Sequence, residues 1–136
     1  MQIVVFKLGE EEYAIDTSKV QVINKMMDIT TVPKAPEYIR GLINLRGSIV
    51  TVIDPYIKLG IDAKDKTCEN IIILETEDEV IGILVDKVTE VIEIDTEELK
   101  NISSSKEDDR DYIKGTINLK GNIITLIDVD VLLDTK

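Results

Sequence analysis

By residue type and spacing, Asp54 and Asp128 are the two residues best suited to act together in a chemical reaction. Each closes one copy of a repeated segment, and two carboxylates held close to each other could act as a general acid and a general base. Each Asp also stands directly before a short apolar stretch, where a carboxylate caps the free N–H groups of a helix start. Because capping explains both residues fully, the sequence predicts no catalytic pair.

Other reactive residue types are scarce or poorly placed. The chain has no His and a single Cys, and Cys68 has no basic neighbour to activate its thiol. Residues 62–69 lack the glycine and the alternating oxygen ligands of a calcium loop. The sequence contains no phosphate loop, nucleophile elbow or dinucleotide fingerprint. We therefore expect a protein that is not an enzyme and that has no cofactor and no metal site.

Charge narrows the range of partners. The 136 residues carry 27 acidic and 16 basic side chains, which gives a net charge of −11, and both nucleic acid and anionic membranes repel such a polyanion. No apolar run approaches the roughly 18 residues that a membrane-spanning helix needs. We expect a cytoplasmic protein that does not bind nucleic acid, does not insert into a membrane and is monomeric when isolated.

A repeat organises the chain. Residues 38–54 return 74 positions later as residues 112–128, with 11 of 17 positions identical. The sequence therefore predicts a single domain of two similar halves, approximately 1–66 and 67–136. A half of about 70 residues would be only marginally stable alone. We expect the halves to pack on each other, and an exchange of strands between them is left open.

The composition predicts a mainly β fold, because the chain has 23 Ile and 13 Val against 11 Leu and 3 Ala, and β-branched side chains favour sheets. Each repeat reads as a hairpin that turns at Arg46-Gly47 or Lys120-Gly121, where glycine supplies a positive φ. Residues 49–53 and 123–127 are apolar on both faces, which is typical of a barrel packed on a second barrel. The other expected strands are residues 3–8, 12–15, 20–23, 71–75, 80–85 and 88–92, and the expected helices begin at Pro55 and cover 129–133.

The segment 32–47, which ends in Asn44-Leu-Arg-Gly47, resembles the signature of the CheW family of chemotaxis coupling proteins. Segments 6–23 and 80–92 are similar to strands of the same family, so that the resemblance covers essentially the whole chain. It implies two pseudo-symmetric, five-stranded SH3-like β-barrels that pack on a shared apolar seam, with short helices.

The resemblance also implies a function, that of a non-enzymatic adaptor in signalling arrays. Such an adaptor links the cytoplasmic tip of methyl-accepting chemotaxis receptors to the histidine kinase CheA, whose regulatory domain has the same fold. By position, the residues that match the receptor-binding surface are Val20, Val22, Ile23 and Arg46, and those associated with binding of the kinase or another partner are Gly41, Gly47, Val88 and Val91.

Two other interpretations stay open. A CheW-like input domain of a larger signalling protein, as in CheV, would carry the same motifs, although no receiver sequence accompanies them here. An unrelated β-barrel that binds a small ligand would need a polar cavity of ligand size. Under the adaptor interpretation we expect Arg46 to matter most, because a long cation at a hairpin tip has no packing role. Lys120, at the equivalent tip, should matter less.

Overall fold

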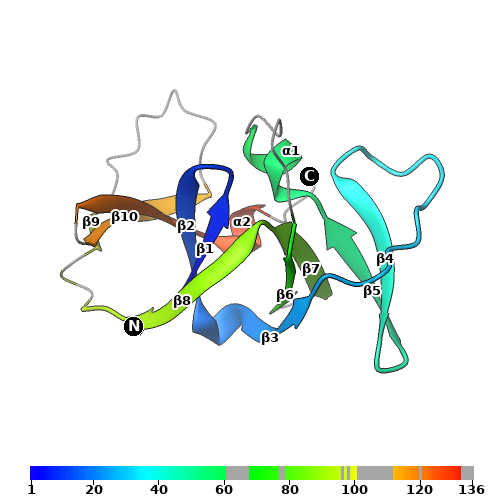
Figure 1. Cartoon of the computed structure of the whole chain (residues 1–136), viewed down its shortest axis with the longest axis horizontal. Helices are drawn as coiled ribbons and strands as arrows, with labels where there is room; N and C mark the ends of the chain where they lie inside the picture. Colours follow the sequence, from blue (N-terminus) through cyan, green and yellow to red (C-terminus); the bar gives the residue numbers. More distant parts are fainter. Residues whose placement is uncertain are drawn as a thin grey trace.

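The computed structural model describes residues 1–60, 68–76, 79–95, 97, 99–100, 112–119 and 121–132. Strands dominate these ranges and form two sheets, which confirms the predicted mainly β fold (Figure 1). In chain order the elements are β1 (Gln2–Leu8), β2 (Glu11–Asp16), the 3-10 helix η1 (Thr17–Lys19), β3 (Val20–Lys25), β4 (Ile39–Leu45), β5 (Ser48–Ile53), α1 (Pro55–Leu59), β6 (Asn70–Glu75), β7 (Val80–Val85), β8 (Lys87–Glu93), β9 (Leu99–Lys100), β10 (Ile113–Leu119), β11 (Asn122–Ile127) and α2 (Val129–Leu132).

Each sheet combines strands from both sequence halves. Sheet A has the order β8-β1-β2-β11-β10-β9, and sheet B has the order β3-β6-β7-β5-β4. The hairpin β1–β2 is therefore completed by strands from the second half, and the hairpin β6–β7 is completed by strands from the first half. Sheet A has a sixth strand because β9, of two residues, pairs with β10. The halves interlock, so that neither can build a complete sheet by itself.

The two copies of the repeat lie in different sheets and pair in the same way. In sheet B the register of β4 and β5 sets Ile43 opposite Val50, and in sheet A the register of β10 and β11 sets Ile117 opposite Ile124. Each repeat hairpin then joins the rest of its sheet through a parallel pairing, β5 with β7 and β11 with β2. The prediction that both repeats form the same hairpin is confirmed.

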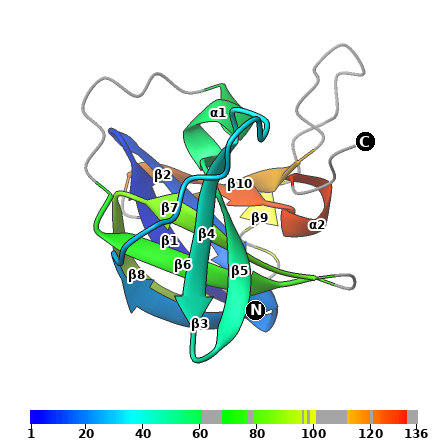
Figure 2. The same cartoon turned by 90° about the vertical axis from the view of Figure 1, so that its right-hand side faces the viewer.

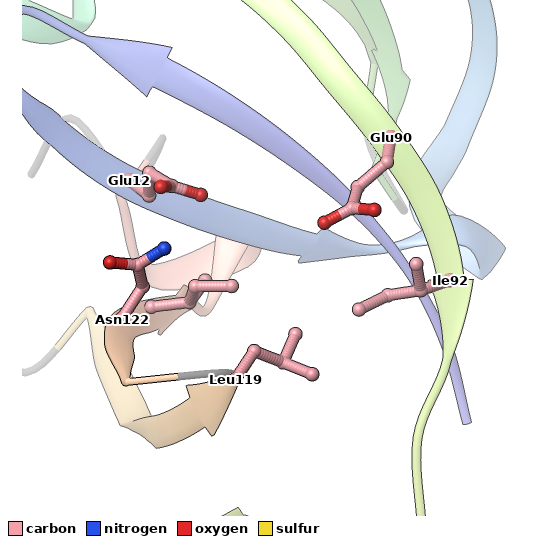
Figure 3. A pocket seen from close by; sticks show the side chains of 6 residues that line it. Glu12, Glu90, Ile92, Leu119 and Asn122 are labelled. Atoms are coloured by element: carbon pink, nitrogen blue, oxygen red, sulfur yellow. The ribbon is translucent and has the colours of Figure 1, made fainter.

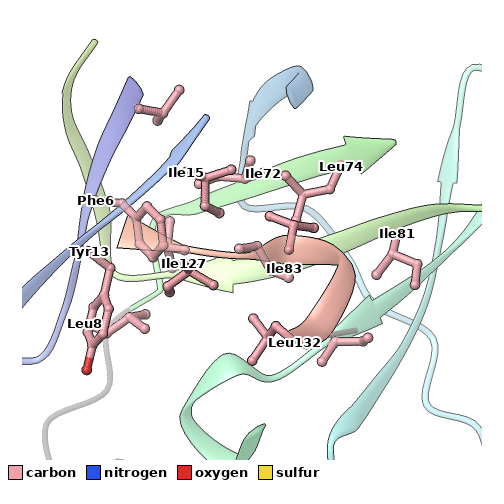
Figure 4. Packing of buried hydrophobic residues seen from close by; sticks show 14 of the residues in the cluster. Phe6, Leu8, Tyr13, Ile15, Ile72, Leu74, Ile81, Ile83, Ile127 and Leu132 are labelled. Carbon is pink, nitrogen blue, oxygen red and sulfur yellow. The ribbon is translucent and has the colours of Figure 1, made fainter. Parts of the chain in front are cut away.

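The apolar side chains form three clusters because strand alternation sends neighbouring residues to opposite faces. In β1, Ile3 and Val5 point to a cluster inside sheet A, whereas Val4 and Phe6 point to a cluster shared by both sheets. A third cluster lies inside sheet B. We call the shared cluster the seam cluster; it forms the predicted apolar seam between the sheets (Figure 4). Its buried members are Val4, Phe6, Leu8, Tyr13, Ile15, Ile53, Tyr56, Ile72, Leu74, Ile81, Ile83, Val85, Ile127, Val129 and Leu132.

The expectation that 49–53 and 123–127 are covered on both faces is wrong at the first residue of each stretch. Ile49 is 65% exposed and Ile123 is 66% exposed. Both residues are the second of their strand and lie beside the turn of their hairpin. Val52 and Ile53, farther along β5, are buried as expected.

Both predicted helix starts are present. The Asp54 carboxylate accepts a hydrogen bond from the Tyr56 backbone N–H at 2.9 Å, and Pro55 is the first helical residue of α1. The Asp128 carboxylate accepts one from the Asp130 N–H at 3.1 Å, at the start of α2. The helix expected over 129–133 spans Val129–Leu132, and residue 133 lies outside the described ranges. Capping is thus the role that the structure gives these two carboxylates.

We expect Asp54→Ala to lower the free energy of unfolding by about 1–2 kcal/mol, the usual cost of losing a cap. Asp54 is 3% exposed and lies 3.8 Å from the Arg40 guanidinium, so its loss also leaves buried N–H groups unsatisfied. Asp128→Ala should cost less, because Asp128 is only partly buried. Urea unfolding of both variants measures the difference. An Asp54→Ala protein as stable as the parent would contradict the capping role.

Candidate functional site

Two edge strands flank the seam cluster. β3 ends sheet B and β8 ends sheet A, and both lie on the same side of the molecule (Figures 1 and 2). Val20 pairs with Leu74 on β6, and Val88 pairs with Phe6 on β1. Since Leu74 and Phe6 both belong to the seam cluster, Val20 and Val88 occupy equivalent positions on its margin, and both are half-buried against it.

The next seam-facing residues on these strands are Ile23 and Val91. Ile23 pairs with Ile72 and packs on the seam cluster, whereas Val91 pairs with Val4 and is 48% exposed. Residues directly opposite each other in a sheet share a face, so Val91 also lies on the seam side. We call Val20, Ile23, Val88 and Val91 the seam margin. The structure thus brings together two residues predicted to bind receptors and two predicted to bind a kinase or another partner.

Val22 lies apart from the seam margin. A register shift between Val20 and Val22 gives β3 one extra residue, and Val22 packs half-buried against the cluster inside sheet B, together with Leu45. Its side chain therefore turns away from those of its neighbours in the predicted receptor surface.

Arg46 and Gly47 form the turn between β4 and β5. Their φ values are 53° and 88°, and two left-handed residues in succession are typical of the tight turn that matches strand twist. The Asn44 side chain closes the turn by accepting a hydrogen bond from the Gly47 N–H at 2.9 Å. Asn118 does the same for Gly121 at 3.2 Å. Arg46 is exposed, whereas Lys120 lies outside the described residues.

Gly41 is buried at the bulge of β4. Its φ is 149°, and a Cβ at this position would lie 2.2 Å from the backbone oxygen of Thr30. Thr30 approaches so closely because it exchanges two backbone hydrogen bonds of 2.8 Å with Leu42. This packing explains the glycine, which is buried. Its assignment to partner binding stays a prediction.

Exposed apolar residues recur at equivalent positions of the two repeats, a feature that we did not predict. Ile49 and Ile123 are 74 positions apart, and so are Ile57, 46% exposed, and Val131, 41% exposed. The sequence repeat could have revealed this feature, because it aligns Ile49 with Ile123 and Ile57 with Val131. Single exposed apolar residues are common on protein surfaces, and the feature of note here is that the two repeats expose them at the same positions.

Tyr56 is a buried titratable residue in the first turn of α1. Its hydroxyl donates a hydrogen bond to the Asp86 carboxylate, which also accepts one from the Gly9 N–H at 2.9 Å. Burial, followed by the hydrogen bond to Asp86, raises the pKa of the Tyr56 hydroxyl well above its ordinary value. The hydroxyl therefore stays protonated and ties α1 to the β1–β2 turn, which is a structural role.

Neither a metal centre nor a membrane span is present among the residues that the structure describes. Within those ranges no group of three or more His, Cys, Asp or Glu side chains is arranged to hold a metal ion. None of the helices there has the length and apolar character needed to cross a bilayer.

We expect Val88→Met to weaken partner binding while the melting temperature changes little. Val88 is half-buried at the seam margin, and a flexible Met can direct its extra atoms outward, where they would obstruct a partner. Differential scanning calorimetry together with a binding titration tests this. Val91→Met, at the more exposed position, is the control for the melting temperature. Overpacking of a core site costs typically about 1–3 kcal/mol, so a clear fall in melting temperature would make Val88 a core residue.

Comparison with known proteins supports the fold and points to a family. The sequence model of the CheW-like domain family matches residues 2–136. The chemotaxis protein CheW of Rhizobium meliloti (strain 1021) is 28% identical over 137 residues, which cover 99% of this chain and 88% of that protein. The crystal structure of the scaffolding protein TtCheW from Thermoanaerobacter tengcongensis matches with a TM-score of 0.89 and 35% identity, over 99% of this chain and 93% of that one.

A match to a longer protein is also present. The chemotaxis protein CheV3 of Helicobacter pylori (strain 26695) is 29% identical over 128 residues, which cover 90% of this chain and 41% of that protein.

Proposed function

The chain belongs to the CheW family, and we propose that it is a non-enzymatic chemotaxis adaptor that couples receptors to the histidine kinase CheA in the cytoplasm. The observation that carries the proposal is the match of the family model to residues 2–136, together with the similarity to a scaffolding protein over 99% of the chain. An adaptor needs separate surfaces for its partners and no reactive groups. The duplicated fold supports the first requirement, because it presents equivalent surfaces on two sheets.

The seam margin is the surface that we assign to an apolar helix of a partner. Val20 and Val88 are half-buried and Val91 is 48% exposed, so an amphipathic helix placed there would bury apolar area without any change in the fold. Helix-in-groove recognition uses apolar anchors of this kind, with affinity from burial. The receptor tip is the partner that we propose for this surface.

The tip of the β4–β5 hairpin is the polar part of the proposed receptor surface. Arg46 is exposed and held by a closed turn. A planar guanidinium in that position can pair with a carboxylate of a partner in a forked geometry. Val22 and Leu45 pack on the same cluster inside sheet B, so we give Val22 the role of supporting the sheet that carries the hairpin.

The exposed apolar pairs are the surfaces that we assign to the kinase. Ile49 and Ile123 lie beside the two hairpin turns, one in each sheet. A kinase domain of the same fold could contact either of these turns, because they are equivalent. Gly47 contributes through the turn conformation that it permits.

A pull-down from the cytosol of a chemotactic bacterium tests the proposal, with this protein as bait. We expect recovery of a histidine kinase and of receptor fragments, and loss of the receptor fragments with an Arg46→Glu bait. Recovery of neither partner by the parent protein would contradict the adaptor function.

A second candidate is the input domain of a larger signalling protein. The match that covers 41% of CheV3 favours it, because it shows that a domain of this kind occurs within longer chains. Both candidates predict receptor binding. They differ in whether a receiver domain is joined to the chain, and the gene that encodes the protein answers this question directly. Among the described residues, the pocket characterised below has a volume of about 170 Å³, less than the roughly 300 Å³ at which ligand sites begin, so this pocket does not favour a small-ligand barrel.

A further inference from the structure

A small pocket opens on the concave face of sheet A. It has a volume of about 170 Å³ and is lined by Glu12 on β2, Glu90 and Ile92 on β8, Leu119 on β10, and Asn122 and Ile124 on β11. Glu12 and Glu90 extend toward the pocket from opposite sides, and Ile92 and Leu119 face each other across its lower part in the view (Figure 3). The pocket therefore combines an apolar wall with two carboxylates.

In sheet B, apolar side chains fill the position that is equivalent to this pocket. Glu90 pairs with Val5 on β1, and its equivalent Val22 pairs with Ile73 on β6. Glu12 pairs with Ile124, and its equivalent on β7, Val80, lies at the level of Val50 on β5. Val22 and Val80 both pack on the cluster inside sheet B. The same architecture thus fills this site with two valines in one sheet and leaves it open, with two glutamates, in the other.

Neither carboxylate belongs to an ion pair among the described residues, where the ion pairs are Lys19–Asp130 and Arg40–Asp54. Lys7 lies opposite Glu12 in the β1–β2 register but is not one of the residues that line the pocket. A pocket that has two carboxylates and no cation in its lining favours a cationic occupant.

We propose that this pocket binds one lysine or arginine side chain of a partner protein. A lysine or arginine side chain that enters between Ile92 and Leu119 would pack its methylene groups on these two residues. Its cation would then lie between the carboxylates of Glu12 and Glu90. The volume suits a single side chain and is too small for a folded segment. The proposal rests on the proposed function, because it takes the occupant from a protein that this adaptor binds.

A titration with n-butylammonium, which has the stem and charge of a lysine side chain, tests the pocket without any partner. In methyl NMR spectra we expect saturable shifts of Ile92, Leu119 and Ile124, and none with 1-butanol. The double variant Glu12→Val/Glu90→Val, which carries the residues of sheet B, should lose the shifts. Glu93→Gln is the control variant. It removes one negative charge from β8, the strand that also carries Glu90, but Glu93 is not part of the pocket.

Two results in this titration would overturn the proposal. One is the absence of saturable shifts with n-butylammonium, and the other is tighter binding of the diamine putrescine, which would identify a site for a free polyamine. If the valine variant fails to fold, Glu12→Gln/Glu90→Gln removes the same charges with less change in shape and gives the same test.

Co-sedimentation with kinase and receptor separates this proposal from the proposed function. The double variant should lose at least about tenfold in affinity for one partner, since loss of a charge pair that becomes desolvated on binding costs more than that. Unchanged affinity for both partners would overturn the assignment to a partner side chain and leave the adaptor function standing. Failure of the parent protein to bind either partner would instead overturn the adaptor function.

Discussion

Replacing Arg46 with Glu should remove most receptor-coupled activation of the kinase while the fold survives. Arg46 is exposed at the β4–β5 turn, so the substitution disturbs no packing, but it places like charge against a carboxylate of the partner. Loss of a charged pair that is desolvated at an interface costs about 2–5 kcal/mol, which corresponds to roughly 30- to 4,000-fold in affinity. An activation assay with purified receptor, kinase and variant measures the effect, and circular dichroism checks the fold.

Two control variants separate charge from turn geometry. Arg46 has a φ of 53°, and Asn tolerates this left-handed conformation better than most residues. Arg46→Asn should therefore keep or improve stability and still lose activation. Lys120→Glu changes the equivalent position of the second repeat and should have the smaller effect. Normal activation by a folded Arg46→Glu protein would leave Arg46 as an ordinary solvated turn residue.

Gly41→Val should unfold the protein or lower its stability severely. The substitution forces a β-branched residue to a φ of 149° and brings its Cβ to 2.2 Å from the Thr30 oxygen. Backbone strain of about 1–3 kcal/mol adds to overpacking of about 1–3 kcal/mol, and together they approach the total stability of many small domains. The yield of soluble protein and urea unfolding measure the loss.

Gly47→Ala is the matched control for this result. Gly47 also has a positive φ, 88°, but a Cβ there meets nothing within 4 Å, so Ala should cost only about 1–2 kcal/mol from the conformation. A Gly41→Val protein of native stability that no longer binds the kinase would show instead that Gly41 contacts the partner.

Local features of the fold could be predicted because the residues that determine them are neighbours in the sequence. The Asn44–Gly47 turn and the Asp54 cap each depend on a few adjacent side chains. The exchange of strands between the halves could be named only as an open alternative. The parallel pairing of β11 with β2 joins residues that are more than 100 positions apart, and a strand pattern looks the same whichever hairpin completes its sheet.

The candidate site was predictable only in part, for a similar reason. Four residues were selected because they match binding positions of the family, and the two edge strands place them along one seam; they are Val20, Ile23, Val88 and Val91. The orientation of Val22 depends on a one-residue register shift in β3, which alternation alone does not reveal. The exposure of Ile49 depends on which elements pack against the end of its hairpin, and the sequence has no local signal for that.

Assembly of the ternary complex is the most direct test of the central claim that this chain couples receptor to kinase. Receptor-containing membranes, purified kinase and this protein are mixed, and the kinase that sediments with the membranes is measured with and without the adaptor. The account predicts that the kinase sediments only when the adaptor is present, and that the Arg46→Glu variant fails to bring it down. Equal sedimentation of the kinase with and without this protein would contradict the account.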